Sequence, residues 1–230
     1  MNTILEGITQ AIYLLTHLDP EVLEITTLSL RLSGIATLLS VIIGLPLGTQ
    51  LALGRFTGRG CLLSLINTGM ALPPVVVGLV VSIFLWRSGP LGSLRLIYTP
   101  LAIIIAQVII AAPVVTGLTA SAIQQLDPRL QIQLKGIGAS PLQMVLALWN
   151  EARLPLLAAL MAGFGSVISE VGASMMVGGN IRYQTRVLTT AIVLETGKGN
   201  FALAIALSVL LLLIAYLINL TLTWIQQRKY

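Results

Sequence analysis

The stretch from Phe201 to Ile225 contains no charged side chain, and most of its residues are large and apolar. About 20 consecutive apolar residues, coiled as a helix, cross the hydrocarbon core of a bilayer. Inside lipid the backbone N–H and C=O groups find no water, so a segment of this kind spans as a helix whose hydrogen bonds are internal. The sequence therefore predicts an all-α membrane protein with this segment as its last spanning helix.

The low charge content supports the same fold class for the rest of the chain. Only 9% of the residues are charged and the mean hydropathy is +0.95, whereas soluble domains carry roughly 25% charged residues. The net charge of +5 would suggest nucleic acid in a soluble protein. Here the basic residues stand singly between apolar blocks, so we interpret them as loop charges that orient a membrane protein and expect no nucleic-acid partner.

Four more spans are predicted, at about residues 22–53, 61–86 and 96–124, and from within 149–155 to about 176. Gly44 and Gly48 in the first of them form a small-xxx-small pair suited to close helix packing. Residues 1–18 alternate apolar and polar positions like a helix lying on the membrane surface. Residues 189–194 are apolar but too short to span, and predict a short or re-entrant helix. The chain is thus expected to be one domain, residues 1–230, with a transmembrane core at 22–226.

The polar segment with the clearest helix start and stop signals is the loop at residues 127–155. Asp127 can cap a short helix that begins with Pro128 and ends near Lys135, because glycines follow. Ser140 and Gln143 form a capping box for a second helix. Two short capped helices with a glycine hinge predict a structured protrusion that another protein can bind.

The distribution of Lys and Arg predicts the orientation. Seven basic residues fall on one side, taken as cytoplasmic together with the C-terminus: Arg55, Arg59, Arg129, Lys135, Arg153, Arg228 and Lys229. The segment before Arg31 has acids but no Lys or Arg, which suits the outside. Five basic residues are left on the outside, where they need another explanation: Arg87, Arg95, Arg182, Arg186 and Lys198.

The sequence contains few residues or motifs that indicate catalysis. The single cysteine, Cys61, and the single histidine, His17, form neither an intrachain disulfide nor a metal cluster. Neither a G-x-x-x-x-G-K-[ST] phosphate loop nor an H-E-x-x-H motif occurs. We therefore expect no catalytic residue, no metal site and no cofactor, and no basic signal-peptide n-region is visible.

Two stretches resemble the permease subunits of binding-protein-dependent ABC importers. The first is Gly138-Ala139-Ser140-Pro141, which is similar to the cytoplasmic loop of that family. Here Ile132-Gln133-Leu134 stands where the family has Glu-Ala-Ala, and Leu154-Pro155 comes about one helical turn later than usual. The second comprises FGSVISEVGA at 164–173, GGNI at 178–181, TRVLTT at 185–190 and LET at 194–196, and it resembles the oxyanion branch, most closely the tungstate type.

The resemblance implies the MetI-like fold and a homodimer around one pore in the inner membrane. It also implies two ATPase subunits at the cytoplasmic loops and an external binding protein that delivers the anion. Seven residues are the implied ATPase-coupling positions: Leu134, Lys135, Gly136, Gly138, Ala139, Ser140 and Pro141. Molybdate and sulfate remain alternatives to tungstate, because the anions are alike and selection is expected mostly in the binding protein.

The candidates for the translocation path or a gate are Gln107, Ser166, Ser169 and Glu170. Glu170 is the single acid inside the fourth span, and a bare carboxylate in the pore would repel an anion. We therefore favour a structural ion pair between Glu170 and Arg31 over a pore role. The serines also have a plain alternative, which is helix packing.

Arg182, Arg186 and Lys198 are candidates for the outer mouth. They either attract the anion toward the pore, or bind acidic groups on the binding protein or on this chain, such as Glu195. A secondary anion transporter is the rival class, but it would show two similar halves and ionisable coupling residues within the membrane. Five unequal spans with one buried acid favour the importer subunit.

Overall fold

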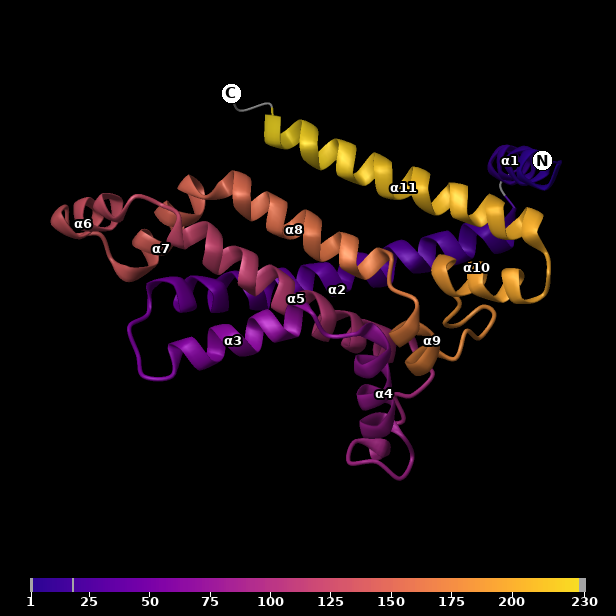
Figure 1. The fold of residues 1–230 in the computed structure, drawn as a ribbon, viewed down its shortest axis with the longest axis horizontal. Helices are drawn as coiled ribbons and strands as arrows, with labels where there is room; N and C mark the ends of the chain where they lie inside the picture. Colours follow the sequence, from indigo (N-terminus) through magenta and orange to yellow (C-terminus); the bar gives the residue numbers. More distant parts are fainter. Residues whose placement is uncertain (1, 18, 228–230) are drawn as a thin grey trace.

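The computed structural model describes residues 2–17 and 19–227, and within them every regular element is a helix (Figure 1). The longer helices are α1 Asn2–Thr16, α2 Pro20–Leu53, α5 Pro100–Gln124, α8 Arg153–Ile168 and α11 Phe201–Gln227. The shorter ones are α3 Arg59–Met70, α4 Pro74–Leu85, the 3-10 turn η1 Gly92–Leu94, α6 Pro128–Gly136, α7 Pro141–Glu151, α9 Gly172–Gly178 and α10 Leu188–Gly197. The all-α prediction is confirmed, while Arg228 and Lys229 lie outside the described residues.

The centre of the fold is the packing of α2 along α5, with α8 beside them (Figure 1). Gly44 and Gly48 of α2 face α5 as the small-xxx-small pair predicts. A Cβ atom at Gly48 would lie 2.6 Å from the carbonyl oxygen of Thr116, and one at Gly44 would lie 2.7 Å from Val115. Because no side chain stands between them at these points, the two backbones approach closely.

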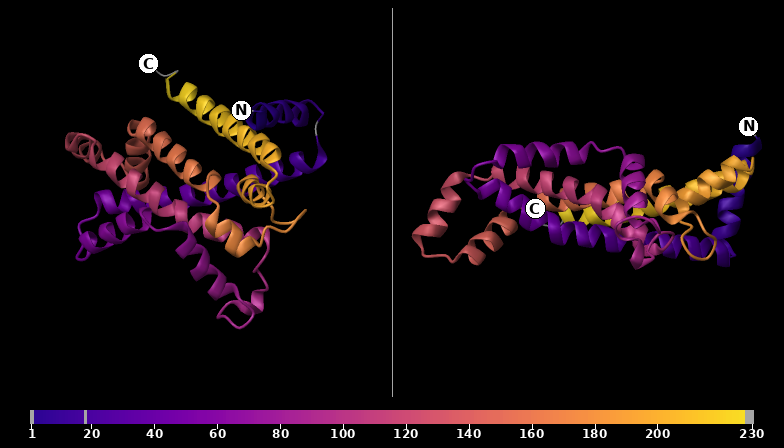
Figure 2. Two further views of the ribbon diagram at one scale, coloured as in Figure 1. Left: turned by 45° about the vertical axis from the view of Figure 1, so that its right-hand side comes forward. Right: turned by 90° about the horizontal axis from the view of Figure 1, so that it is seen from below.

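A sharp bend divides the second predicted span, and another lies at the start of the fourth. The second span is two helices, α3 and α4, that meet at 101° around Pro73-Pro74, and α4 projects from the bundle (Figures 1 and 2). Pro74 is the first residue of α4, where its missing N–H is not needed. Helices α7 and α8 meet at 78°. Within the described part of the chain, three helices are individually long and apolar enough to cross a membrane, and up to five spans result if each bent pair counts as one.

The helix of the fourth span ends before Met176, where the sequence predicted its end. Helix α8 ends at Ile168, residues 169–171 break it, and α9 continues in a new direction. At this break the Glu170 side chain accepts the N–H groups of Ala173 and Ser174, near the start of α9. The expected short helix at 189–194 is present as α10.

The N-terminal helix α1 lies beside the start of α11 (Figures 1 and 2). Gly7 allows this contact, since a Cβ atom there would lie 2.5 Å from the side chain of Ile205. The buried residues of α11 all fall in its first half, while Leu212 and Tyr216 farther along are 69% and 63% exposed. The second half of α11 therefore stands free of the bundle and presents an apolar surface.

Candidate functional site

The loop between α5 and α8 folds as the capping signals predict. The Asp127 carboxylate accepts the N–H of Arg129 at 2.8 Å at the start of α6. At α7, Ser140 Oγ accepts the Gln143 N–H at 3.3 Å and Gln143 Oε1 accepts the Ser140 N–H at 2.8 Å. Gly138 between the helices has φ +77°, a left-handed conformation that favours glycine. The protrusion is thus built from two defined helices and one conformationally demanding turn.

A small apolar cluster joins this loop to the bundle. Buried Ile123, Leu148 and Ala152 form its centre, and side chains from α2, α6 and α7 pack around them. The indole Nε1–H of Trp149 donates to Thr49 Oγ1 at 2.8 Å, which connects α7 to α2. A force on α7 therefore reaches α2 and α5 through packed side chains and one hydrogen bond.

The tip of the loop exposes large apolar side chains. Ile132, Ile137 and Leu142 are 70%, 80% and 68% exposed. Of the seven predicted coupling residues, Leu134 and Ala139 are half-buried and the other five are exposed. The three apolar residues were missed by the sequence reasoning, although large apolar side chains inside the one long polar loop were a usable signal.

Glu170 is buried, with 4% exposure, and its carboxylate is fully engaged inside the chain. Oε1 accepts the N–H of Ala173 at 2.6 Å, and Oε2 accepts both the N–H and the hydroxyl of Ser174, at 2.9 and 2.6 Å. Arg31 is exposed and forms none of the ion pairs among the described residues. The predicted Arg31–Glu170 pair is therefore wrong, because backbone and hydroxyl donors of α9 satisfy the carboxylate instead.

A polar cluster surrounds this break in the middle of the protein. Ser29 and Ser33 of α2, Gln107 of α5 and Thr189 of α10 line a small cavity of about 10 Å³ together with Glu170. Thr189 Oγ1 donates to the Glu170 carbonyl at 2.8 Å. The Oε1 atom of Gln107 is buried and has no hydrogen-bond partner among the described residues. Gln107 and Glu170, two of the predicted path residues, thus lie in one polar core.

The other two path candidates are placed differently. Ser166 is half-buried and donates to the Gly163 carbonyl at 2.8 Å, whereas Ser169 is exposed and donates to the Gly165 carbonyl at 2.7 Å. Both hydroxyls satisfy their own helix. Only Ser169 presents a polar surface at the α8–α9 break.

The basic residues predicted for the outer mouth, Arg182, Arg186 and Lys198, form ion pairs within the chain. Arg182 and Arg186 both bind the carboxylate of Glu21, with Arg182 Nε 3.0 Å and Arg186 Nη1 3.3 Å from Oε1. Lys198 binds Glu195 at 2.7 Å. The hydrogen bond and charge of Glu21 raise the pKa of Arg182, and the Lys198 hydrogen bond is the main cause that lowers the pKa of Glu195.

These residues line a pocket of about 490 Å³ in which three acids, counting Asp19, face the three basic residues. Of the two accounts given for the outer arginines, internal pairing is observed, with Glu21 as the partner. Glu195, the partner named from the sequence, pairs with Lys198. The sequence separation between Glu21 and Arg182 explains why local reasoning missed the pairing.

The protein family follows from residues 40–229, which match the model of the "binding-protein-dependent transport system inner membrane component". The chain belongs to this family. It is 38% identical to the tungstate uptake system permease protein TupB of Peptoclostridium acidaminophilum, over 99% of this chain and 100% of that protein. It is 37% identical to TupB of Campylobacter jejuni, over 95% and 92% of the two chains. A probable anion ABC transporter permease of Haloferax volcanii is 41% identical over 85% and 87%.

Solved structures of this transport family share the fold. A chain of the MetNI methionine ABC transporter in an inward-facing conformation superposes with a TM-score of 0.70 at 20% identity, covering 94% of this chain and 96% of that one. A chain of an amino acid ABC transporter gives 0.68 at 16% identity, covering 93% and 96%. At these identities the likeness concerns the fold, which is that of MetI-like ABC importer permeases.

Proposed function

We propose that this chain forms, as a homodimer, the pore of an ABC importer that passes an oxyanion, tungstate foremost, into the cell. ATP is hydrolysed on a separate partner subunit, and an external binding protein delivers the anion. The observation that carries this proposal is the 38% identity to a tungstate uptake permease across nearly the whole of both chains. In this arrangement the chain is a pore subunit of the inner membrane, with the loop at 127–155 and the C-terminus in the cytoplasm.

The protruding loop supports the ATPase partner. Exposed apolar side chains that lie close together mark protein–protein interaction sites, and Ile132, Ile137 and Leu142 are all exposed on this loop. Side chains at this tip that pack into a groove of the ATPase would transmit its motion through Trp149 and Thr49 to α2. The predicted coupling residues lie on the same helices and turn as these three apolar side chains.

The apolar surfaces of α4 and of the second half of α11 support assembly in the membrane. Val75, Leu79 and Ile83 on α4 are 57%, 47% and 56% exposed. Surfaces of this kind face either lipid or a second copy of the chain. A twofold pair would surround one water-lined path, which a dianion needs because charge is costly to bury in hydrocarbon.

Reconstitution tests the proposal. The chain, its ATPase and its binding protein are placed in liposomes, and uptake of tungstate, molybdate and sulfate is measured with ATP present or absent at the ATPase side. We expect ATP-dependent uptake of tungstate. Uptake by the chain without the ATPase would refute the importer and favour a secondary transporter, whereas ATP-dependent uptake of only molybdate or sulfate would correct the substrate.

A pair of glycine variants tests the loop within the same assay. Gly138→Leu adds bulk at a residue whose φ of +77° an L side chain rarely adopts. Gly136→Leu adds the same bulk at the end of α6, where the space is open and the φ is ordinary. We expect Gly138→Leu to uncouple ATP hydrolysis from uptake while Gly136→Leu changes it less. Normal coupling in both variants would remove the loop from the mechanism.

A further inference from the structure

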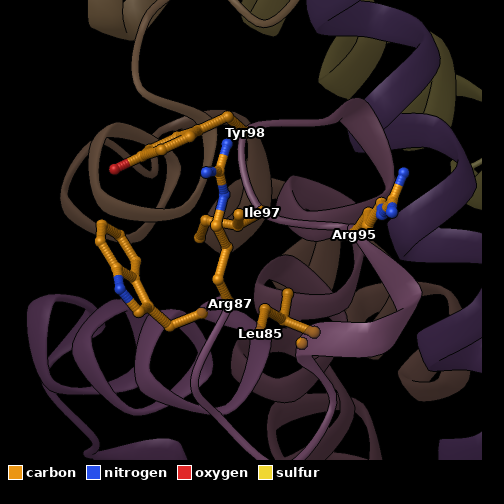
Figure 3. Close-up of a pocket in the computed structure, with 7 residues that line it drawn as sticks. Leu85, Arg87, Arg95, Ile97 and Tyr98 are labelled. Atoms are coloured by element: carbon orange, nitrogen blue, oxygen red, sulfur yellow. The ribbon is translucent and has the colours of Figure 1, made fainter.

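The end of α4 and the turn that follows it form a pocket of about 770 Å³ (Figure 3). Its lining includes Trp86, Arg87, Arg95 and Tyr98. In Figure 3 the Arg87 side chain extends toward Tyr98, and Arg95 stands on the other side of Ile97. The pocket therefore has a guanidinium group directed along an aromatic wall and a second one at its margin.

The charge of this pocket differs from that of the other outer cluster. No Asp or Glu is among its lining residues. Within residues 2–17 and 19–227, neither Arg87 nor Arg95 takes part in an ion pair or a side-chain hydrogen bond. Arg182 and Arg186, by contrast, share Glu21. Of the four arginines assigned to the outside, Arg87 and Arg95 are those without a carboxylate partner among the described residues.

The polar side-chain groups of the pocket are almost all donors. Each guanidinium carries five N–H donors and no acceptor, the indole of Trp86 is donor only, and the Tyr98 hydroxyl can donate. The planar guanidinium of arginine can donate two parallel hydrogen bonds to two oxygen atoms bonded to the same central atom. A pocket with these donors and a positive charge therefore favours an oxyanion and disfavours a cation.

The pocket is also held in shape. The Tyr98 N–H donates to the Val177 carbonyl of α9 at 2.8 Å, which ties the turn to the bundle. A Cβ atom at Gly92 would lie 2.3 Å from the Trp86 carbonyl oxygen, so the turn closes tightly at this glycine. Arg95 and Tyr98 themselves have φ of +53° and +63°. The backbone that carries the donors is thus held in place, so ordering the turn costs little entropy when a ligand binds.

The position of the pocket fits the start of a transport path. Helix α5 begins at Pro100, two residues after Tyr98, and ends beside the coupling loop. Its 25 residues span about 37 Å at ~1.5 Å per residue. The pocket therefore lies across the membrane from the loop, on the outer side in the predicted orientation. Val177 of α9, which holds Tyr98, follows the α8–α9 break at Glu170.

We propose that this pocket binds the free tetrahedral oxyanion at the outer face, with Arg87 in contact with the anion and Arg95 adding to the attracting field. The identity of the anion rests on the proposed function, but its binding does not depend on transport. A dianion held here is kept near the outer mouth after it leaves the binding protein, which raises its local concentration.

Equilibrium binding tests the proposal. Sodium tungstate and sodium molybdate are titrated by calorimetry into the purified full chain in phospholipid-free detergent, without binding protein. Arg87→Gln removes one charge-assisted contact and should weaken binding at least ~10-fold. Arg95→Gln should weaken it about 2- to 5-fold, since it acts through the field, and added NaCl should weaken the wild type further. Arg31→Gln, an equal charge loss at another exposed arginine, should change nothing.

Three results would overturn the proposal. The first is that the wild-type chain binds no oxyanion, and the second is that Arg87→Gln binds the oxyanion as tightly as the wild type. The third is a native mass spectrum in which Arg87→Gln has lost a bound phospholipid but still binds tungstate, which would assign Arg87 to a lipid. Matched elution and thermal unfolding of the variants show that folding is intact. If the liposome assay shows tungstate uptake but the chain does not bind tungstate, the pocket proposal fails alone. If the chain binds but no oxyanion is transported, the proposed function fails instead.

Discussion

Replacing Glu170 by glutamine tests the account of the α8–α9 break. The carboxylate accepts three hydrogen bonds from α9, from two backbone N–H groups and one hydroxyl. Glutamine has nearly the same shape but offers one oxygen and one NH₂ group. If the oxygen keeps the Ser174 donors, the NH₂ group points at the N–H of Ala173. At least one buried donor then loses its acceptor.

The expected loss follows from these contacts. A buried donor left without a partner costs about 1–3 kcal/mol, and hydrogen bonds to a charged group are worth about 1.5–3 kcal/mol against about 1 for neutral ones. The neutral amide is less costly to bury, which offsets part of this loss. We expect a net destabilisation of about 2–3 kcal/mol. For a chain of this size that lowers the unfolding temperature by roughly 4–12 °C.

The assay is thermal unfolding of the purified variants in one detergent. Arg31→Gln should lie within about 0.5 kcal/mol of the wild type, because Arg31 is exposed and unpaired. Glu170→Gln combined with Arg31→Gln should be additive within about 0.5 kcal/mol, while the combination with Ser174→Ala should depart from additivity by about 0.5–3 kcal/mol. Coupling to Arg31 and additivity with Ser174 would together refute the structural account.

Three further perturbations follow from other contacts. Gly48→Ala places a methyl group 2.6 Å from a backbone oxygen of α5 and should cost about 1–3 kcal/mol in thermal unfolding. Gly34→Ala in the same helix meets nothing within 4 Å and should gain about 0.5–1 kcal/mol, and equal effects would contradict the close packing. Neutralising Arg182 and Arg186 together should change the unfolding temperature little, because exposed ion pairs contribute little to stability, and should leave maximal uptake unchanged. A fall in uptake at unchanged stability would restore an anion-guiding role. The pKa of Glu195 is lowered in the fold, so its ion pair stabilises the protein above the ordinary carboxyl range and is lost as pH falls. Glu195→Gln should therefore flatten the decline in unfolding temperature between about pH 5 and 3, and an unchanged decline would refute this contribution.

Much of the local structure could be predicted because its causes are local. The capping box at Ser140 and Gln143 and the cap at Asp127 act over two or three residues, and the structure contains both. The spans α2, α5 and α11 follow from apolar length alone. The 101° bend after α3 lies at Pro73-Pro74, but proline identity does not specify the angle.

The pairing of charges could not be predicted in the same way. Glu170 was expected to meet Arg31 because both are charged residues in the outer halves of their helices. The carboxylate instead turns to donors three and four residues ahead, which become available only because α8 ends at Ile168. At this break Thr189, which is distant in sequence, donates a hydrogen bond to the Glu170 carbonyl.

Apolar length and hydrogen-bonding needs inside lipid are properties of single segments, so the sequence by itself determined that the protein is helical, where its long apolar helices lie, and how the loop at 127–155 is capped. The tertiary structure alone decided which outer charges cancel. Glu21 reaches Arg182 and Arg186 only when the start of α2 lies beside the turn before α10, whereas no described Asp or Glu pairs with Arg87 or Arg95. Charge compensation depends on distances of a few ångströms between segments far apart in the chain, and only packing sets those distances.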